Sequence, residues 1–188
     1  MRLWQSGEFA KRAPPPRLVV FGSFPGHAYR CAGKAAWDFD GPHYRLGPRG
    51  PEFVGPHRAS VAIARFHWLL KRAGLMETHV AALLSARFGE PDVDDGRLCI
   101  ALVKEIAGLA TSKGAEFVVL DWRGRDDSAV AVAMSDALRV VSVLEVRSRF
   151  DVDDPRYQIP HDGHPSAAAV DLLVRELAQR YGPILTTP

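Results

Sequence analysis

Three short apolar runs along the chain predict buried β-strands. They span residues 17–21, 116–120 and 139–144, and the first follows three prolines and ends at Gly22. A run in which both alternating sets of residues are apolar is typical of a strand that is covered on both faces, as in a parallel sheet.

Three longer segments carry apolar positions at helical spacing, namely residues 60–72, 99–110 and 170–181. Gly74 follows the first as a cap, and Lys113 and Gly114 end the second directly ahead of the second strand. Helices that alternate with buried strands predict an α/β fold, in which a parallel sheet is flanked by helices in three layers.

The segment of residues 23–56 has no clear period and is rich in Gly, Pro, His and aromatic residues. We expect an irregular loop region there, of the kind that compact domains keep for a functional reason. Residues 37–39 and 43–46 suggest a small hairpin within it. A length of 188 residues predicts a single domain over residues 1–188.

Composition narrows the class of protein. Apolar residues at 47% and charged residues at 24% are average for soluble globular proteins, and no apolar run is long enough for a membrane span. Because the formal charge is only +2 and the arginines are scattered, nucleic-acid binding is not expected.

The N-terminus lacks the pattern of a secretion signal, so we expect a cytoplasmic protein. Cys31 and Cys99 lie far apart in sequence, and we expect reduced, structural thiols.

The clearest chemical motif is Pro-His-Asp-Gly-His-Pro-Ser-Ala at residues 160–167. Asp162 stands two residues before His164, and Pro165 is expected to open the last helix. Asp162 could accept a hydrogen bond from one ring nitrogen of His164 and leave the other to act as a general base. The alternative is that both side chains only satisfy free amides at the helix start.

Ser23 is the candidate nucleophile, because it follows the first strand and lies between Gly22 and Gly26. His27 could donate a hydrogen bond to a developing oxyanion. The carboxyl ends of parallel strands meet at one edge, where these residues and the loop with His164 are expected to lie. The alternatives are that Ser23 is a turn residue and that His27 packs or faces water.

A metal-assisted hydrolase built on His161, Asp162 and His164 is a further alternative, since imidazole and carboxylate groups suit divalent metals. Three candidate ligands within four residues seldom all reach one ion, and a fourth ligand would have to come from elsewhere. We therefore expect neither a metal nor another cofactor.

Asp162-Gly163-His164-Pro165-Ser166, followed by an amphipathic helix, resembles the terminal block of the SGNH (GDSL-type) hydrolases. The resemblance covers residues 60–181. It implies a flavodoxin-like sheet of about five parallel strands and a Ser-His-Asp triad. It also implies hydrolysis or transfer of an acyl ester, with a small acyl ester or a carbohydrate ester as substrate. This chain has Gly22-Ser23 where the family has Gly-Asp-Ser, and it has no clear Gly-x-Asn-Asp block.

Two alignments to this family imply different proteins. In the first, Ser23, Asp162 and His164 form the triad of a compact, complete enzyme. In the second, residues 18–30 resemble the third strand of the family and the loop after it, with His27 near the oxyanion-stabilising position. The fold would then be incomplete and the nucleophile absent. The chain would be an inactive binding module, or would need a partner chain to cover its exposed sheet edge. Gly22, Gly26 and His27 are the candidate residues for binding the oxyanion or the substrate.

Overall fold

The computed structural model describes much of the chain. Its residues are 8, 11, 14–23, 27–79, 83, 87, 92–121, 142–145, 151, 154–160 and 164–186, with the backbone alone for 142–145. Three residues of the predicted sites, Gly26, His161 and Asp162, lie outside this set.

The chain divides into two compact units. The first comprises Met1–Phe24, Ile106–Asp126 and Arg139–Pro188, and the second comprises Pro25–Glu105 and Asp127–Leu138. Whether residues 1–188 form a single domain stays a prediction.

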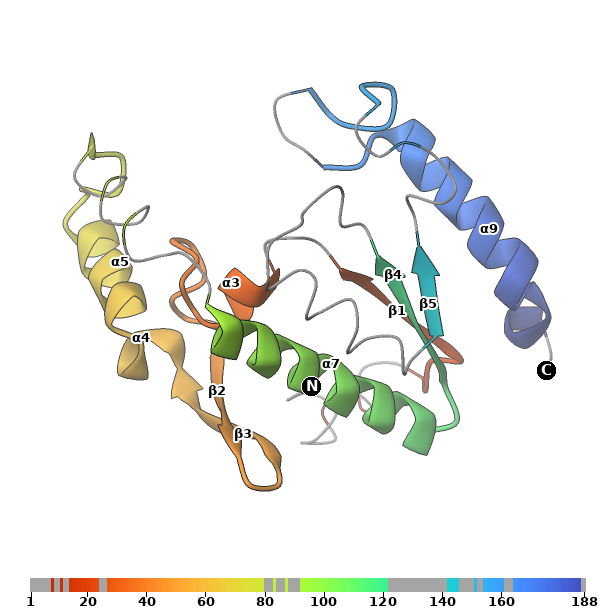
Figure 1. Cartoon of the computed structure of the whole chain (residues 1–188), viewed down its shortest axis with the longest axis horizontal. Coiled ribbons are helices and arrows are strands. Elements are labelled where there is room, and N and C mark those ends of the chain that lie inside the picture. The colour runs from red at the N-terminus through yellow and green to blue at the C-terminus, as the bar shows by residue number, and fades with distance from the viewer. Residues whose placement is uncertain are drawn as a thin grey trace. The chain divides into compact units, whose positions relative to one another are not determined.

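A parallel sheet forms the centre of the first unit. Its strands are β1 (Leu18–Ser23), β4 (Glu116–Asp121) and β5 (Ser142–Glu145), in the order β1-β4-β5 (Figure 1). The α/β class and the three predicted strands are confirmed. The third strand begins at Ser142, whereas the predicted residues 139–141 lie outside the described set.

Helix α9 (Ala167–Thr186) packs on one face of this sheet (Figure 1). The contacts join Leu18, Val118 and Leu120 of the strands to Leu177, Tyr181 and Ile184 of the helix. In addition, the Arg17 guanidinium donates a hydrogen bond to the Ile184 carbonyl oxygen at 3.3 Å. Because the end of α9 meets the start of β1, the helix runs antiparallel to the strands.

Helix α7 (Val93–Ser112) leads directly into β4, as predicted. Gly114 has a φ of 76°, and its N–H and that of Ala115 donate to the carbonyl oxygens of Thr111 and Ala110. This pattern is the Schellman motif, which needs a residue with positive φ after the helix. The predicted end of the helix before Lys113 and Gly114 is therefore confirmed.

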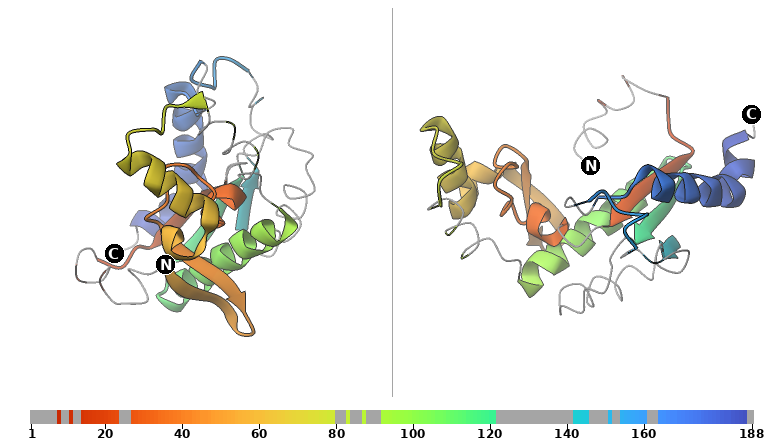
Figure 2. Two further views of the ribbon diagram at one scale, coloured as in Figure 1. Left: turned by 90° about the vertical axis from the view of Figure 1, so that its left-hand side faces the viewer. Right: turned by 90° about the horizontal axis from the view of Figure 1, so that it is seen from above.

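The second unit contains α3 (His27–Cys31), a hairpin and two further helices, besides the part of α7 up to Glu105. The hairpin consists of β2 (Pro42–Gly47) and β3 (Gly50–Pro56), drawn in orange in Figure 2. The prediction of an irregular segment over residues 23–56 was therefore wrong for most of its length. Residues 43–46 do form a strand, but they pair with β3 and not with residues 37–39.

The two remaining helices are α4 (His57–Ser60) and α5 (Ala62–Arg72). Val61 separates them in an extended conformation, so the predicted start at Ser60 was two residues early. Gly74, with a φ of 69°, completes a Schellman motif after α5, which confirms the predicted cap.

Candidate functional site

His164 lies on a loop whose backbone is clamped by an antiparallel bridge between Gln158 and Pro165. The Ile159 N–H donates to the His164 carbonyl oxygen at 2.8 Å, and the Ser166 N–H donates to the Tyr157 carbonyl oxygen at 2.9 Å. Pro165 occupies the position of the bridge that needs no N–H donor. The bridge therefore fixes the backbone of His164 directly before α9.

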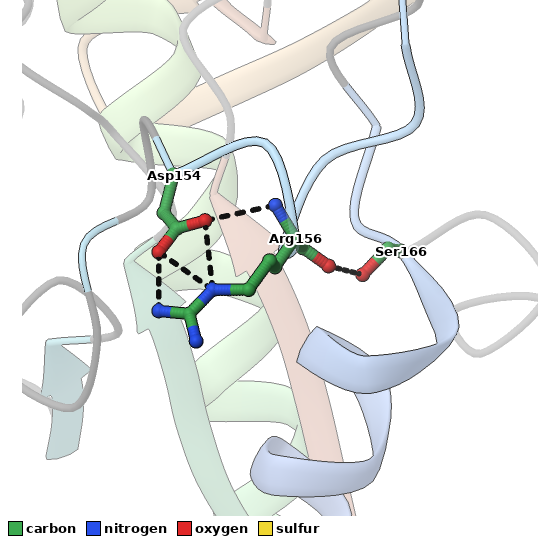
Figure 3. Close-up of polar contacts among 3 residues, drawn as sticks. All are labelled: Asp154, Arg156 and Ser166. Atoms are coloured by element: carbon green, nitrogen blue, oxygen red, sulfur yellow. Dashed lines mark hydrogen bonds and ion pairs between the residues drawn. The ribbon is translucent and has the colours of Figure 1, made fainter.

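Ser166, and not Pro165, makes the transition to α9. Its hydroxyl accepts a hydrogen bond from the Ala169 N–H at 3.4 Å and donates one to the Arg156 carbonyl oxygen at 2.6 Å (Figure 3). A serine in this position is a helix N-cap. The helix thus begins at Ala167, two residues later than the predicted opening at Pro165.

Arg156 is held in turn by Asp154. The Asp154 carboxylate accepts hydrogen bonds from the Arg156 N–H at 2.9 Å and from its guanidinium at 2.6 to 3.1 Å (Figure 3). These bonds lower the pKa of Asp154 below its ordinary value. The segment before the His164 loop is therefore anchored at both the side chain and the backbone of Arg156.

Replacing Ser166 by alanine is expected to lower the free energy of unfolding by about 1–2 kcal/mol, because α9 loses its cap and the loop loses a bond to Arg156. Urea unfolding would measure the loss. Ser112→Ala is the matched control. Its hydroxyl donates only to the Leu109 carbonyl oxygen within the last turn of α7, so that variant should lose a few tenths of a kcal/mol. Equal losses in the two variants would contradict the capping role.

The three strands end side by side at one edge of the sheet. Ser23 is in register with Asp121, and Asp121 with Glu145. Because α9 runs antiparallel to the strands, the helix begins toward this same edge (Figure 1). The His164 side chain in the preceding loop is exposed. The strands therefore place Ser23 at the carboxyl edge, whereas its approach to the His164 loop there stays a prediction.

Ser23 is completely buried, and its hydroxyl has no hydrogen-bond partner in the part of the chain that the structure describes. Side chains alternate between the two faces of a strand, which puts Ser23 on the face opposite Leu18 and α9. Gly22 precedes it in β1. The Ser23 hydroxyl is thus not hydrogen-bonded to His164 in this structure, and its role as nucleophile stays a prediction.

His27 begins α3 in the second unit. Burial, and then the charge of Arg30, lower the pKa of His27 to about 4, so that the imidazole is neutral at neutral pH. Its predicted role in oxyanion binding stays a prediction.

The second unit holds a serine–histidine contact that no motif in the sequence indicates. The Ser60 Oγ lies 2.5 Å from the His43 Nδ1. His43 is opposite Gly55 in the hairpin, at an irregularity in the register that follows His43. Such β-bulges re-aim side chains and are frequent next to active sites. Burial lowers the pKa of His43, which favours the neutral imidazole that a general base requires.

Within the described residues, no three His, Cys, Asp or Glu side chains are grouped so that they could hold a metal ion. The proposed ligands His161 and Asp162 lie outside this set, so a site that includes them stays untested.

Among the described helices, none combines the length and the apolar composition that crossing a bilayer requires.

Comparisons of this chain with family models, with curated proteins and with solved structures each found no match.

Proposed function

We propose that this chain carries a three-layer, flavodoxin-like domain of SGNH type, and that it hydrolyses or transfers an acyl ester. The observation that carries the proposal is the exposed side chain of His164 on a clamped loop directly before α9. A general base needs such a fixed backbone together with access to substrate. The parallel sheet of the first unit is compatible with this architecture.

In the proposed mechanism, the Ser23 Oγ attacks the ester carbonyl carbon while His164 takes the hydroxyl proton. Asp162 orients the imidazole, and the protonated His164 then donates its proton to the departing alcohol. Water hydrolyses the acyl-serine by the reverse proton transfers. The substrate class is a small acyl ester or a carbohydrate ester, no cofactor takes part, and the expected location is the cytoplasm. Attack by Ser23 requires a conformation in which its buried hydroxyl is accessible.

The burial of Ser23 favours the alternative of a non-catalytic or partner-dependent module. In the described sheet, β1 is an edge strand that pairs with β4 on one side. An exposed strand edge can accept a strand from a partner chain. The partner would then complete the sheet and supply the nucleophile.

The Ser60–His43 contact favours a second candidate site for the same chemistry. A serine within hydrogen-bond reach of a neutral imidazole is the basic unit of nucleophilic catalysis. Ser60 also stands just before α5, whose first turn has no side-chain cap. The free amides at such a helix start could stabilise an oxyanion. The Arg65 guanidinium, bound to the Ala59 carbonyl oxygen at 2.8 Å, adds positive charge at this junction.

One experiment distinguishes catalysis by Ser23, catalysis by Ser60 and the non-catalytic or partner-dependent module. A fluorophosphonate probe is applied to the folded chain, and the labelled residue is mapped by mass spectrometry. Hydrolysis of p-nitrophenyl acetate would be measured in parallel. If Ser23 is the nucleophile, it is labelled, and Ser23→Ala and His164→Gln each lower the rate at least about 100-fold. If Ser60 is labelled instead, and Ser60→Ala and His43→Gln lower the rate of ester hydrolysis equally, the catalytic site is the Ser60–His43 pair of the second unit.

Ser112→Ala is the control for an unrelated exposed serine and should retain the full rate. A folded chain that takes up no label and hydrolyses no ester would exclude both catalytic sites and leave the binding module. Labelling of a nucleophile on an added partner chain, seen only when both chains are present, would then support the partner-dependent form.

A further inference from the structure

Cys31 and Cys99 are 68 residues apart in sequence, yet their sulfur atoms lie 2.9 Å from each other. Cys31 ends α3 and Cys99 lies within α7, and both belong to the second unit. Both cysteines are free thiols in this structure. A disulfide requires a sulfur separation of about 2.05 Å, so a small approach of the two side chains would be enough to join them.

The two thiols differ in accessibility. Cys99 is completely buried and packs with Ala28 and Ile100, whereas Cys31 is only partly buried at the margin of that cluster. The hydrogen bond with Cys31, and then burial, raise the pKa of Cys99 above its ordinary value. Cys99 therefore remains a protonated thiol, and Cys31 is the sulfur that a reagent from solution can reach.

An ion pair also joins the segment that follows α3 to the start of α7. The Lys34 ammonium, just after α3, lies 2.5 Å from the Asp95 carboxylate and 3.7 Å from that of Asp92. Asp92 and Asp95 also accept hydrogen bonds from each other's N–H groups at 2.9 Å, which caps the start of α7. The end of α3 is thus fixed against α7 before any bond forms between the sulfurs.

We propose that Cys31 and Cys99 form a redox site that responds to hydroperoxides. The Cys31 thiol first loses its proton, and the thiolate sulfur attacks the terminal oxygen of the hydroperoxide. The O–O bond breaks, Cys31 becomes a sulfenic acid, and the departing alkoxide or hydroxide takes up the proton that Cys31 lost and leaves as an alcohol or water. The Cys99 sulfur then displaces hydroxide from the Cys31 sulfenic acid. The Cys99 proton leaves with that hydroxide as water, and a disulfide remains between α3 and α7. A dithiol reductant reverses the change by thiol–disulfide exchange.

The disulfide would restrict the unfolded chain across a long loop, which stabilises the folded state. The oxidised second unit is therefore expected to unfold several degrees higher than the reduced one. This expectation holds whether or not the chain hydrolyses esters, because neither cysteine belongs to the proposed catalytic groups.

The experiment is to treat the folded, fully reduced chain with equimolar hydrogen peroxide, then denature it and alkylate the remaining thiols. We expect the loss of both alkylation sites, a mass lower by two hydrogen atoms, and a cross-linked peptide that contains Cys31 and Cys99. Dithiothreitol should restore both thiols and the original unfolding temperature. The variant Cys99→Ala should instead leave a sulfenic acid at Cys31 that dimedone traps.

Two results would overturn the proposal. In one, both thiols of the wild-type chain stay fully alkylatable under peroxide that oxidises free cysteine to completion. In the other, Cys31 proceeds to sulfinic acid and no cross-link to Cys99 forms. Both readouts use the wild-type chain, so they do not depend on the folding of a variant.

Discussion

Replacing Gly33 by alanine is expected to lower the free energy of unfolding by about 3–5 kcal/mol. Gly33 follows α3 with a φ of 69°, a conformation that a side chain makes costly. A Cβ atom there would stand 2.1 Å from the His57 Nδ1 and 2.4 Å from its Cγ. The His57 ring is almost completely buried, so it cannot move aside without disturbing its surroundings.

Gly74 provides a matched control within the same unit. It has the same φ of 69° after a helix, but a Cβ at this position would meet nothing within 4 Å. Gly74→Ala should therefore cost only the backbone strain, about 1–2 kcal/mol. The difference between the two variants, measured by urea unfolding, isolates the contact with His57.

A double variant tests the cause directly. Once His57 is shortened to alanine, the added methyl group at residue 33 no longer meets a ring. The combined loss should then be smaller than the sum of the two single losses by at least about 1 kcal/mol. Additive losses, or equal losses in Gly33→Ala and Gly74→Ala, would show that the ring does not pack on Gly33.

The parts of the fold that could be predicted from sequence are those with a local cause. The run at residues 116–120 predicts a strand because both of its faces are buried, and Val118 and Val119 are indeed completely inaccessible. Gly74 and Gly114 predict helix ends because each adopts a positive φ. Helix α7 begins at Val93, ahead of the predicted segment of residues 99–110. This start also has a local signal, since Asp92 and Asp95 have the spacing of residues that cap each other's N–H groups.

Residues 43–46 were predicted to pair with residues 37–39 and not with β3, because β3 does not have the composition of a strand. The sequence of β3, Gly-Pro-Glu-Phe-Val-Gly-Pro, carries two prolines and two glycines, which usually indicate a loop. Both prolines lie near the ends of the strand, and the register of the strand is irregular opposite His43. Pairing of this kind depends on the turn between the strands and on the surrounding helices.

The candidate sites, too, could be predicted only where their cause is local in the sequence. Local sequence predicts the exposed loop of His164, because Pro165 and the capping serine follow it directly. The contacts of Ser60 with His43 and of Cys31 with Cys99 join residues 17 and 68 positions apart. No periodicity along the chain encodes such a contact, since it exists only after the second unit has folded.

Acidification is expected to destabilise the second unit strongly between pH 6.5 and pH 4. Burial lowers the pKa of four histidines in that unit: His27, His43, His57 and His67. Neighbouring charges change the size of these pKa shifts. Arg30 lowers the pKa of His27 further, whereas the charge of Asp38 acts to raise the pKa of His57. The folded unit therefore resists protonation at several positions at once.

The sign of the effect follows from the protons bound in each state. An unfolded histidine binds its proton as the pH falls through about 6.5, whereas folded His27 does so only near pH 4. Between these values the unfolded chain binds more protons, so the free energy of unfolding decreases as the pH falls. His27 alone accounts for a loss on the order of 3 kcal/mol, complete once the pH is below 4.

Urea unfolding of the whole chain at a series of pH values from 7.5 to about 4.5 measures this loss as a falling midpoint. His27→Gln removes one titrating group and should make the pH dependence shallower, although its stability at pH 7.5 can differ from that of the wild type. The decisive quantity is therefore the change of the urea midpoint with pH, and not the stability at one pH. If the wild-type midpoint stays constant from pH 7.5 to pH 5, the four imidazoles are as accessible to protons in the folded chain as in the unfolded one, and their burial in the second unit is wrong.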